Sequence, residues 1–168
     1  MANIDLFLPF LDKWEGGVAL ERGDRGGLTY RGVTLATLRR LCPGATVKDL
    51  LTMSRTQWEQ LVDRLFWQRW QADRIESQSV AEMLVDWTWM SGKWGVVLPQ
   101  ALLRVIPDGR VGASTLLAVN ESDPYTLWAD LKEARKRFFL RLTQRSRRQR
   151  RFLRGWLNRL NDLKFKEE

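Results

Sequence analysis

Two carboxylates and a hydroxyl in the N-terminal part of the chain have the residue types and spacing for acid catalysis on a glycosidic bond. Glu15 precedes Gly16-Gly17 at the end of a predicted helix, Asp24 follows nine residues later, and Thr29 follows five residues after that. The C-terminal end of a helix carries partial negative charge, which favours a protonated Glu15 carboxyl. Such a carboxyl can protonate a leaving oxygen, while Asp24 could activate water or stabilise a cationic transition state and Thr29 could position that water.

These carboxylates also have structural interpretations. A glutamate before two glycines is commonly a solvated helix end, and an aspartate in a glycine-rich segment commonly bonds its own backbone in a turn. The composition limits the alternatives, because the chain has no histidine and a single cysteine, Cys42. Histidine bases, histidine-ligated metals, internal disulfides and cysteine-cluster zinc sites are therefore excluded. Any proton chemistry falls to carboxylates, and we expect no cofactor or metal.

The same segment resembles a known family. Trp14-Glu15-Gly16-Gly17 and the stretch from Asp24 to Thr34, DRGGLTYRGVT, resemble the opening motif of glycoside hydrolase family 108. That family contains lysozyme-like N-acetylmuramidases, which are often encoded by phages or prophages, and some members have been labelled secretion activators. The resemblance implies that Glu15 is the catalytic acid and that Asp24 and Thr29 assist it. The chain departs from the pattern at Val18, where tyrosine is common, and at residues 20–22, which affects the expected substrate contacts.

The elements that must position these residues are predicted from hydrophobic spacing and capping signals. We predict a mainly α fold: a lysozyme-like helical domain with a small loop or β-hairpin near residues 18–33, continuous with a C-terminal helical region. Apolar residues at spacings of three and four indicate a helix over 4–15. Thr34 is a plausible N-cap for a helix to about residue 41. Ser54 with Gln57, and Ser79 with Glu82, have the pattern of capping boxes for helices reaching about residues 70 and 90.

The second half is predicted to be helical throughout. A helix follows Gly92 and Gly95 and runs to about residue 105, and Pro107-Asp108-Gly109 forms a turn. A short helix near 113–120 comes next. Asp123 then caps a long basic helix with proline at its first position. We expect a lysozyme-like catalytic region over 1–92 and a helical peptidoglycan-binding-like region over 93–168, sharing one core.

Tryptophans gather in the middle of the chain. Sugar rings pack on indole faces, although helical spacing assigns most of these residues to a buried core. Trp87 and Trp89 are the candidates for exposure near a cleft, and we expect them and Tyr30 to contact the glycan. The residues concerned are Trp58, Trp67, Trp70, Trp87, Trp89 and Trp94.

Residues 86–115 resemble the C-terminal region of the same family, which is described as a predicted peptidoglycan-binding domain. The resemblance implies bacterial peptidoglycan as the partner. In physical terms, the glycine-containing element from Asp108 to Thr115 is a structural turn that positions two helices. The matching residues are Asp86, Ser91-Gly92, Gln100, Leu102, Asp108-Gly109, Val111-Gly112 and Thr115.

Positive charge is concentrated in one segment. From Lys132 to Arg159 there are 12 lysines and arginines against one acid, Glu133, whereas the rest of the chain has 16 bases and 19 acids. The basic helix 132–159 therefore predicts an anionic partner among envelope components, with a solvated helix face as the alternative. A nucleic-acid arm is disfavoured because the segment contains no zinc-finger or RNA-binding motif.

The N-terminal residues do not have the pattern of a secretory signal. They carry Asp5 and Asp12 without a basic segment, and no apolar run approaches the roughly 20 residues of a membrane-spanning helix. We therefore expect a monomer that has no transmembrane segment and is made in the cytoplasm. It would act at the cell wall or periplasm after release.

These observations favour a peptidoglycan hydrolase. By the resemblance, it cleaves the β-1,4 bond between N-acetylmuramic acid and N-acetylglucosamine, as an endolysin of a phage or prophage does. The alternative is a protein with the same fold and no hydrolase activity, namely a non-catalytic peptidoglycan-binding or secretion-linked module.

Overall fold

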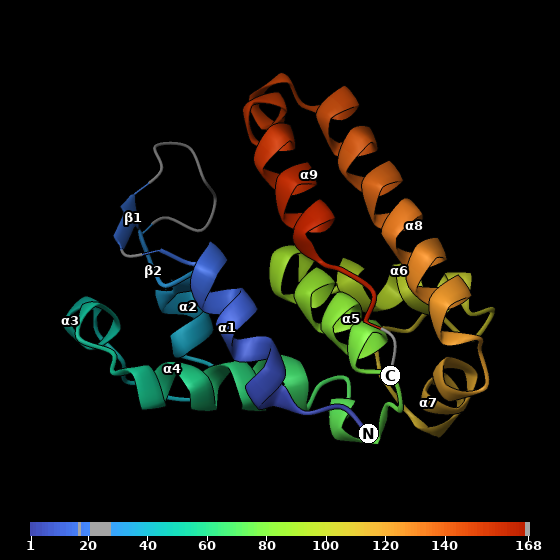
Figure 1. Ribbon diagram of the computed structural model, residues 1–168. Coiled ribbons are helices and arrows are strands. Elements are labelled where there is room, and N and C mark those ends of the chain that lie inside the picture. The colour runs from blue at the N-terminus through green and yellow to red at the C-terminus, as the bar shows by residue number, and fades with distance from the viewer. Residues whose placement is uncertain (17, 21–27, 167–168) are drawn as a thin grey trace. The chain divides into compact units, whose positions relative to one another are not determined.

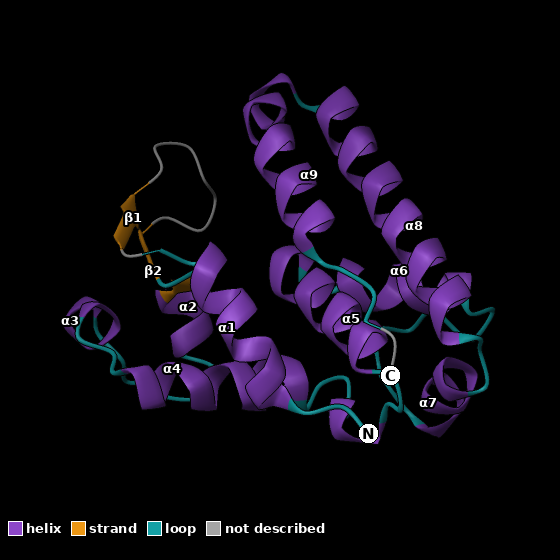
Figure 2. Cartoon of the chain, in the orientation of Figure 1, coloured by secondary structure: helices purple, strands orange, loops and turns teal. Residues whose placement is uncertain are grey.

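The computed structural model describes residues 1–16, 18–20 and 28–166. Their fold is mainly α with a small sheet, as predicted (Figure 2). The chain divides into two compact units. The N-terminal unit is Ile4–Leu65, and the C-terminal unit is Phe66–Glu168 together with Met1–Asn3.

The N-terminal unit begins with α1 (Ile4–Trp14), which buries Phe7, Leu8 and Leu11 on one face. This is the face that the apolar spacing predicts. Three short strands and three helices follow along the chain. They are β1 (Val18–Leu20), β2 (Leu28–Tyr30), β3 (Val33–Thr34), α2 (Leu35–Leu38), α3 (Val47–Leu51) and α4 (Arg55–Val62).

The three strands form an antiparallel sheet in the described part of this unit, in the order β1-β2-β3. Between β2 and β3 the chain turns through Arg31 and Gly32, whose φ angles are 47° and 73°. Two successive positive φ angles are characteristic of a tight type I′ hairpin turn. Thr34 ends β3 and caps α2 by accepting a 3.0 Å hydrogen bond from the Thr37 N–H. This cap confirms the predicted helix start, although α2 ends at Leu38.

The helix predicted from Ser54 to about residue 70 is interrupted. Ser54 and Gln57 form the predicted capping box, and α4 then runs only to Val62. A π-helical turn, η1 (Asp63–Trp67), replaces regular α-helix beyond it. The π-turn accommodates one extra residue per turn and so shifts which side chains face inward. Phe66 and Trp67, which lie in it, are both buried.

The C-terminal unit is built around α5 (Gln78–Ser91), whose residues from Gln78 to Thr88 are all buried. Ser77, rather than the predicted Ser79, caps this helix, and its hydroxyl accepts from the Val80 N–H. Ser79 is instead buried within the helix. The other elements are η2 (Ala72–Arg74), α6 (Trp94–Leu102), α7 (Ala113–Asn120), α8 (Pro124–Arg145), η3 (Arg147–Phe152) and α9 (Leu153–Asp162).

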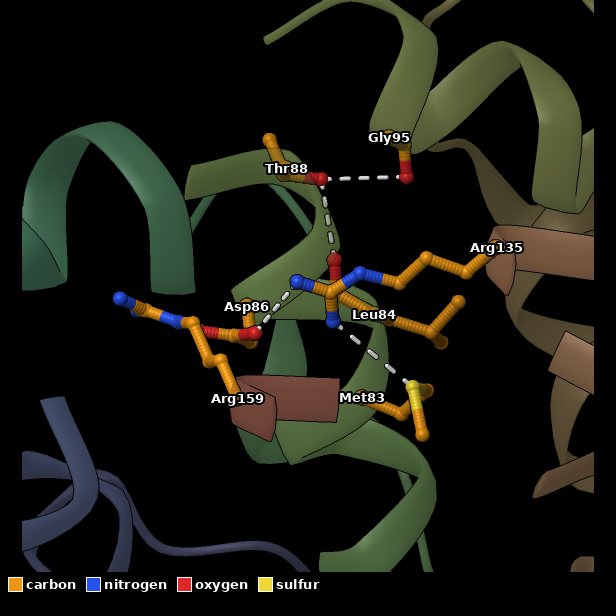
Figure 3. A network of polar contacts seen from close by, with 7 residues as sticks. All are labelled: Met83, Leu84, Asp86, Thr88, Gly95, Arg135 and Arg159. Atoms are coloured by element: carbon orange, nitrogen blue, oxygen red, sulfur yellow. Dashed lines mark hydrogen bonds and ion pairs between the residues drawn. The ribbon is translucent and has the colours of Figure 1, made fainter. Parts of the chain in front are cut away.

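The helices α5 and α6 approach closely at Gly95. A Cβ atom added to Gly95 would collide with the backbone of Thr88. The Thr88 hydroxyl donates to the carbonyl oxygens of Leu84, at 3.0 Å, and Gly95, at 3.1 Å (Figure 3). It also accepts a 2.7 Å hydrogen bond from the Trp70 indole N–H. Gly95 is therefore required by the packing of two helices.

A buried ion triad joins α5 to the two C-terminal helices. Asp86 accepts from Arg135 of α8 and from Arg159 of α9, each at 2.6 Å (Figure 3). Burial alone would raise the pKa of Asp86, but the guanidinium groups of Arg159 and Arg135 more than offset it and hold the pKa below its usual value. Asp86 is therefore a charged residue in the centre of the unit.

Both ends of the chain attach to the N-terminal part of α5 and the loop before it. The Ala2 N–H donates to the Ile75 carbonyl oxygen at 2.8 Å. The Lys166 N–H donates to the Ser79 hydroxyl at 2.9 Å, and the Lys166 ammonium pairs with Glu82 at 2.9 Å. The C-terminal unit thus closes on segments from both ends of the chain.

The predicted basic helix is interrupted at Ser146. The helix α8 ends at Arg145, a 3₁₀ segment, η3, follows, and α9 runs back beside α8 (Figure 1). Among the described residues, no helix combines the length and the apolar character needed to cross a membrane.

Candidate functional site

Glu15 lies immediately after the last residue of α1. Its backbone N–H still donates to the Leu11 carbonyl oxygen at 2.9 Å, so the carboxylate-bearing residue is fixed to the helix end. The residue is partly exposed, and β1 begins three residues later. Glu15 therefore occupies the negative end of a short helix within reach of solvent.

Thr29 and Tyr30 are neighbours on β2, the central strand of the sheet. Thr29 is in register with Ala19 of β1 and Thr34 of β3, while Tyr30 is opposite Val18 and Val33. Successive strand residues point to opposite faces, so these two side chains leave the sheet on different sides. Both are partly exposed. The third predicted catalytic residue, Asp24, lies outside the described residues.

A charged network connects the end of α1 to the hairpin turn, and the sequence analysis missed it. Asp12, three residues before Glu15, pairs with Arg31 at 3.2 Å and with Arg55 of α4 at 3.1 Å. Arg31 also lies over the Trp58 ring, and its carbonyl oxygen accepts from the Trp58 indole N–H at 3.0 Å. These contacts join α1, the β2–β3 turn and α4 around the segment that carries Glu15.

A signal for this network was present in the sequence. Arg31-Gly32 separates two short β-prone runs as a hairpin turn does, and a charged residue in such a turn is free to pair with a neighbouring helix. Spacing along the chain gives no indication that the partner is Asp12, because the pairing depends on how α1 packs on the sheet.

The predicted exposure of Trp87 is wrong. Trp87 is fully buried, with its ring 6.3 Å from that of Phe138 on α8. The reason is that all residues of α5 from Gln78 to Thr88 are buried, whereas the prediction assumed one solvent-facing side. Trp89, two residues closer to the helix end, is partly exposed and packs against Phe66 with ring centroids 4.7 Å apart. Of the other central tryptophans, Trp58, Trp67 and Trp70 are fully buried core residues, as expected.

A separate hollow of about 530 Å³ lies in the N-terminal unit. Its lining includes Leu38, Cys42, Ala45, Asp49, Met53 and Leu61, and it contains neither Glu15 nor the residues of β2. In the described part of the chain, no group of three or more cysteine, aspartate or glutamate side chains is placed to hold a metal ion.

The turn at Asp108-Gly109 is structural, as the sequence analysis indicates. The Gln100 side-chain amide donates to Asp108 at 3.1 Å and to the Arg110 carbonyl oxygen at 2.8 Å, and it accepts from the Gly109 N–H at 2.8 Å. Hydrogen bonds from the Arg110 N–H and from Gln100 lower the pKa of Asp108 below its usual value. A buried glutamine therefore holds the loop between α6 and α7.

Comparisons with known proteins agree with the resemblance in the N-terminal motif. The glycosyl hydrolase 108 family model matches residues 8–92, and a model described as a predicted peptidoglycan domain matches residues 94–161. The compact units divide instead between Leu65 and Phe66, so the domain boundary at 92/93 stays a prediction.

A solved structure, described as the structure of Brucella abortus SagA, has a similar fold. The TM-score is 0.83 at 25% sequence identity, with 95% of this chain and 90% of that chain covered. No curated protein matches. With half of its length matched, including the whole Glu15 segment, the chain belongs to the glycosyl hydrolase 108 family.

Proposed function

We propose that this protein hydrolyses the β-1,4 bond between N-acetylmuramic acid and N-acetylglucosamine in bacterial peptidoglycan, with Glu15 as the proton donor. The observation that carries the proposal is the family match over residues 8–92, which includes the Glu15 motif. The partly exposed position of Glu15 at a helix end supports it, because a general acid must reach its substrate.

The proposed reaction uses carboxylate chemistry alone. Glu15 transfers its proton to the glycosidic oxygen as the bond to the anomeric carbon breaks. Asp24 activates the attacking water or stabilises the positive charge that develops on the sugar, and the Thr29 hydroxyl positions that water. The water oxygen ends on the anomeric carbon of the new reducing sugar.

Aromatic residues would hold the glycan. Tyr30 and Trp89 are partly exposed and remain the proposed contacts for sugar rings. Trp87 is excluded from this role because its indole has no exposed face. The ion pair between Asp12 and Arg31 would position the hairpin against the helix end that carries Glu15.

The predicted peptidoglycan domain over residues 94–161 supports a wall polymer as the substrate. We propose that the protein acts as a monomer at the cell wall or in the periplasm, after release from the cytoplasm, as an endolysin of a phage or prophage would.

Analysis of the products of purified sacculi tests the proposed bond. Digested sacculi are reduced with borohydride and analysed by mass spectrometry. A muramidase yields muropeptides with reduced N-acetylmuramic ends. Reduced N-acetylglucosamine ends would still demonstrate glycosidase activity, but they would contradict the assigned bond.

The same samples distinguish a binding module from an enzyme. A non-catalytic module would sediment with sacculi and release no new reducing ends. That combination would contradict the proposed hydrolysis.

A further inference from the structure

The junction between α8 and α9 carries an unusual concentration of arginine. We name residues 141–154 the arginine tip: it contains seven arginines and no lysine, aspartate or glutamate. All seven side chains are exposed. Like charges at this density repel one another, so the tip costs the free protein some stability that an anionic partner would restore. The seven are Arg141, Arg145, Arg147, Arg148, Arg150, Arg151 and Arg154.

Most of these charges are not used inside the described part of the protein. Arg135 and Arg159 lie on either side of the tip in the sequence, and both are buried in ion pairs with Asp86. Within the tip, Arg150 donates to the Thr143 carbonyl oxygen at 3.2 Å. Apart from Arg151, no arginine of the tip pairs with a carboxylate among the described residues. The guanidinium groups of the other exposed tip arginines are therefore available to a ligand.

The tip is held in a defined shape. The Ser146 N–H donates to the Leu142 carbonyl oxygen at 3.1 Å where α8 ends, and η3 then leads into α9, which runs back beside α8 (Figure 1). Trp156 of α9 stacks between Phe139 of α8 and Phe152 of η3, with centroid distances of 5.2 and 5.9 Å. An aromatic stack thus fixes the arginine-bearing backbone to the two helices.

The exclusive use of arginine indicates the chemistry of the partner. A guanidinium group binds phosphate oxygens through two parallel hydrogen bonds, which a lysine ammonium does not do. The tip therefore suits an array of phosphate groups. Single-stranded nucleic acid would need aromatic faces open to bases, but Phe152 and Trp156 are stacked on each other. Binding to an anionic membrane surface requires positive charge but no aromatic faces open to bases. Aromatic side chains can then lie at the level of the lipid headgroups.

We propose that the arginine tip binds the phosphate headgroups of anionic membrane lipids. This proposal rests on the proposed function in one respect: peptidoglycan lies next to membranes that contain such lipids. Binding at the tip would keep the enzyme beside its substrate through a surface distant in sequence from Glu15.

Vesicle flotation with the full-length protein tests the proposal. Vesicles of phosphatidylglycerol and phosphatidylethanolamine are compared with vesicles of phosphatidylcholine alone at about 0.1 M salt, where the Debye length is about 10 Å. We expect the protein to float with the anionic vesicles only. Equal flotation with both kinds of vesicle would overturn the proposal, because headgroup charge would then play no part.

A charge-matched pair of variants locates the surface. The tip variant carries R145Q, R147Q, R148Q and R154Q, which leaves Arg150 and Arg151 and their contacts unchanged. The control variant removes four exposed positive charges elsewhere, through R40Q, K48Q, R64Q and R110Q. Each arginine near an anionic surface contributes roughly fivefold to partitioning. The tip variant should therefore bind the anionic vesicles at least about tenfold more weakly than the wild type. An equal loss in the control variant would show that net charge alone is responsible and would overturn the proposal.

Two further measurements separate this proposal from its rivals. Binding to a DNA oligonucleotide that is tighter than binding to anionic vesicles at the same salt would assign the tip to nucleic acid and overturn lipid binding. Hydrolysis of detergent-washed sacculi, which contain no lipid, should be the same for the wild type and both variants. If the wild type floats with anionic vesicles but hydrolyses no sacculi, the proposed function is contradicted and the proposed lipid site is supported.

Discussion

At the scale of single residues, Asp86 and Glu15 illustrate two different uses of a carboxylate. Asp86 is fully buried and forms ion pairs with two guanidinium groups that would otherwise be isolated in the core. Glu15 is partly exposed at a helix end. The burial of Asp86 argues for a structural role, although a buried charged aspartate in a hydrolase could be mistaken for a catalytic group.

Replacing Asp86 with asparagine should strongly destabilise the C-terminal unit. The substitution leaves Arg135 and Arg159 buried without a counter-charge, and breaking a buried pair in this way costs about 3–5 kcal/mol. Urea unfolding measures the loss. Asp130→Asn, on the exposed side of α8, is the control and should change stability by less than about 0.5 kcal/mol. A loss below about 1 kcal/mol in Asp86→Asn would contradict the triad's role.

Asp86 also predicts how stability depends on pH. Its pKa is lower in the folded protein than the ordinary value of 3.8, so the unfolded chain takes up the proton first as the pH falls. The contribution of Asp86 is therefore complete above about pH 5 and is lost progressively below about pH 4, as the pH falls toward the lowered pKa of the folded protein. The free energy of unfolding should fall on the acid side more steeply in the wild type than in Asp86→Asn. Parallel curves would show that another carboxylate is responsible.

The sequence predicts some residues of the site and misses others for a physical reason. Glu15 and Thr29 belong to a local motif whose spacing is visible in the chain. The contact of Arg31 with Asp12 joins residues 19 positions apart, and it exists only because a hairpin turn packs near a helix end. The burial of Trp87 likewise depends on α8, which lies far along the chain.

At the scale of elements, caps and breaks decide where helices begin and end. Asp123 accepts from the Thr126 N–H at 2.8 Å and starts α8 where the Asp-Pro signal predicts. The Ser79–Glu82 pattern predicts a start of α5 two residues too late, because Ser77 and Ser79 both have a hydroxyl that can cap. The π-turn after Val62 gives no local signal, since it serves the packing of Phe66 and Trp67.

Two glycine-to-alanine substitutions should have opposite effects on stability, because Gly95 lies at the close approach of α5 and α6 and Gly155 has open space around it. Gly95→Ala should destabilise the protein by about 1–3 kcal/mol or more, because its methyl group would collide with the Thr88 backbone. Gly155→Ala in α9 meets no atom within 4 Å and should stabilise the helix by about 0.5–1 kcal/mol. Thermal unfolding of both variants measures the difference. Equal melting temperatures would contradict the described packing.

At the scale of the whole molecule, the compact units and the family matches divide the chain at different places. The helix α5 lies within the hydrolase family match, yet it is the buried centre of the C-terminal unit. Periodicity along the chain predicts the helices but not this assignment, because burial on all sides depends on α6 and α8. A boundary at residue 92 therefore matches the limits of the sequence motifs, whereas the compact units divide between Leu65 and Phe66.

This difference predicts which fragment of the chain folds. A fragment of residues 93–168 lacks α5 and leaves Arg135 and Arg159 without Asp86, so it should not unfold cooperatively. A fragment of residues 66–168 retains the triad and should give a cooperative transition. Near-ultraviolet circular dichroism during thermal unfolding compares them. Cooperative unfolding of the shorter fragment would show that the peptidoglycan-domain match is an independent module.

The proposed hydrolysis depends above all on Glu15 as the proton donor, and the rate of sacculus hydrolysis by Glu15→Gln tests this role most directly. Glutamine keeps the size of the side chain but has no proton to transfer, so the release of reducing ends should fall by about 10²–10⁴-fold. Glu59→Gln, the same change on an exposed ion pair of the same unit, serves as the control and should retain wild-type activity. Glu15→Gln with unchanged melting temperature and undiminished hydrolysis would contradict the assignment.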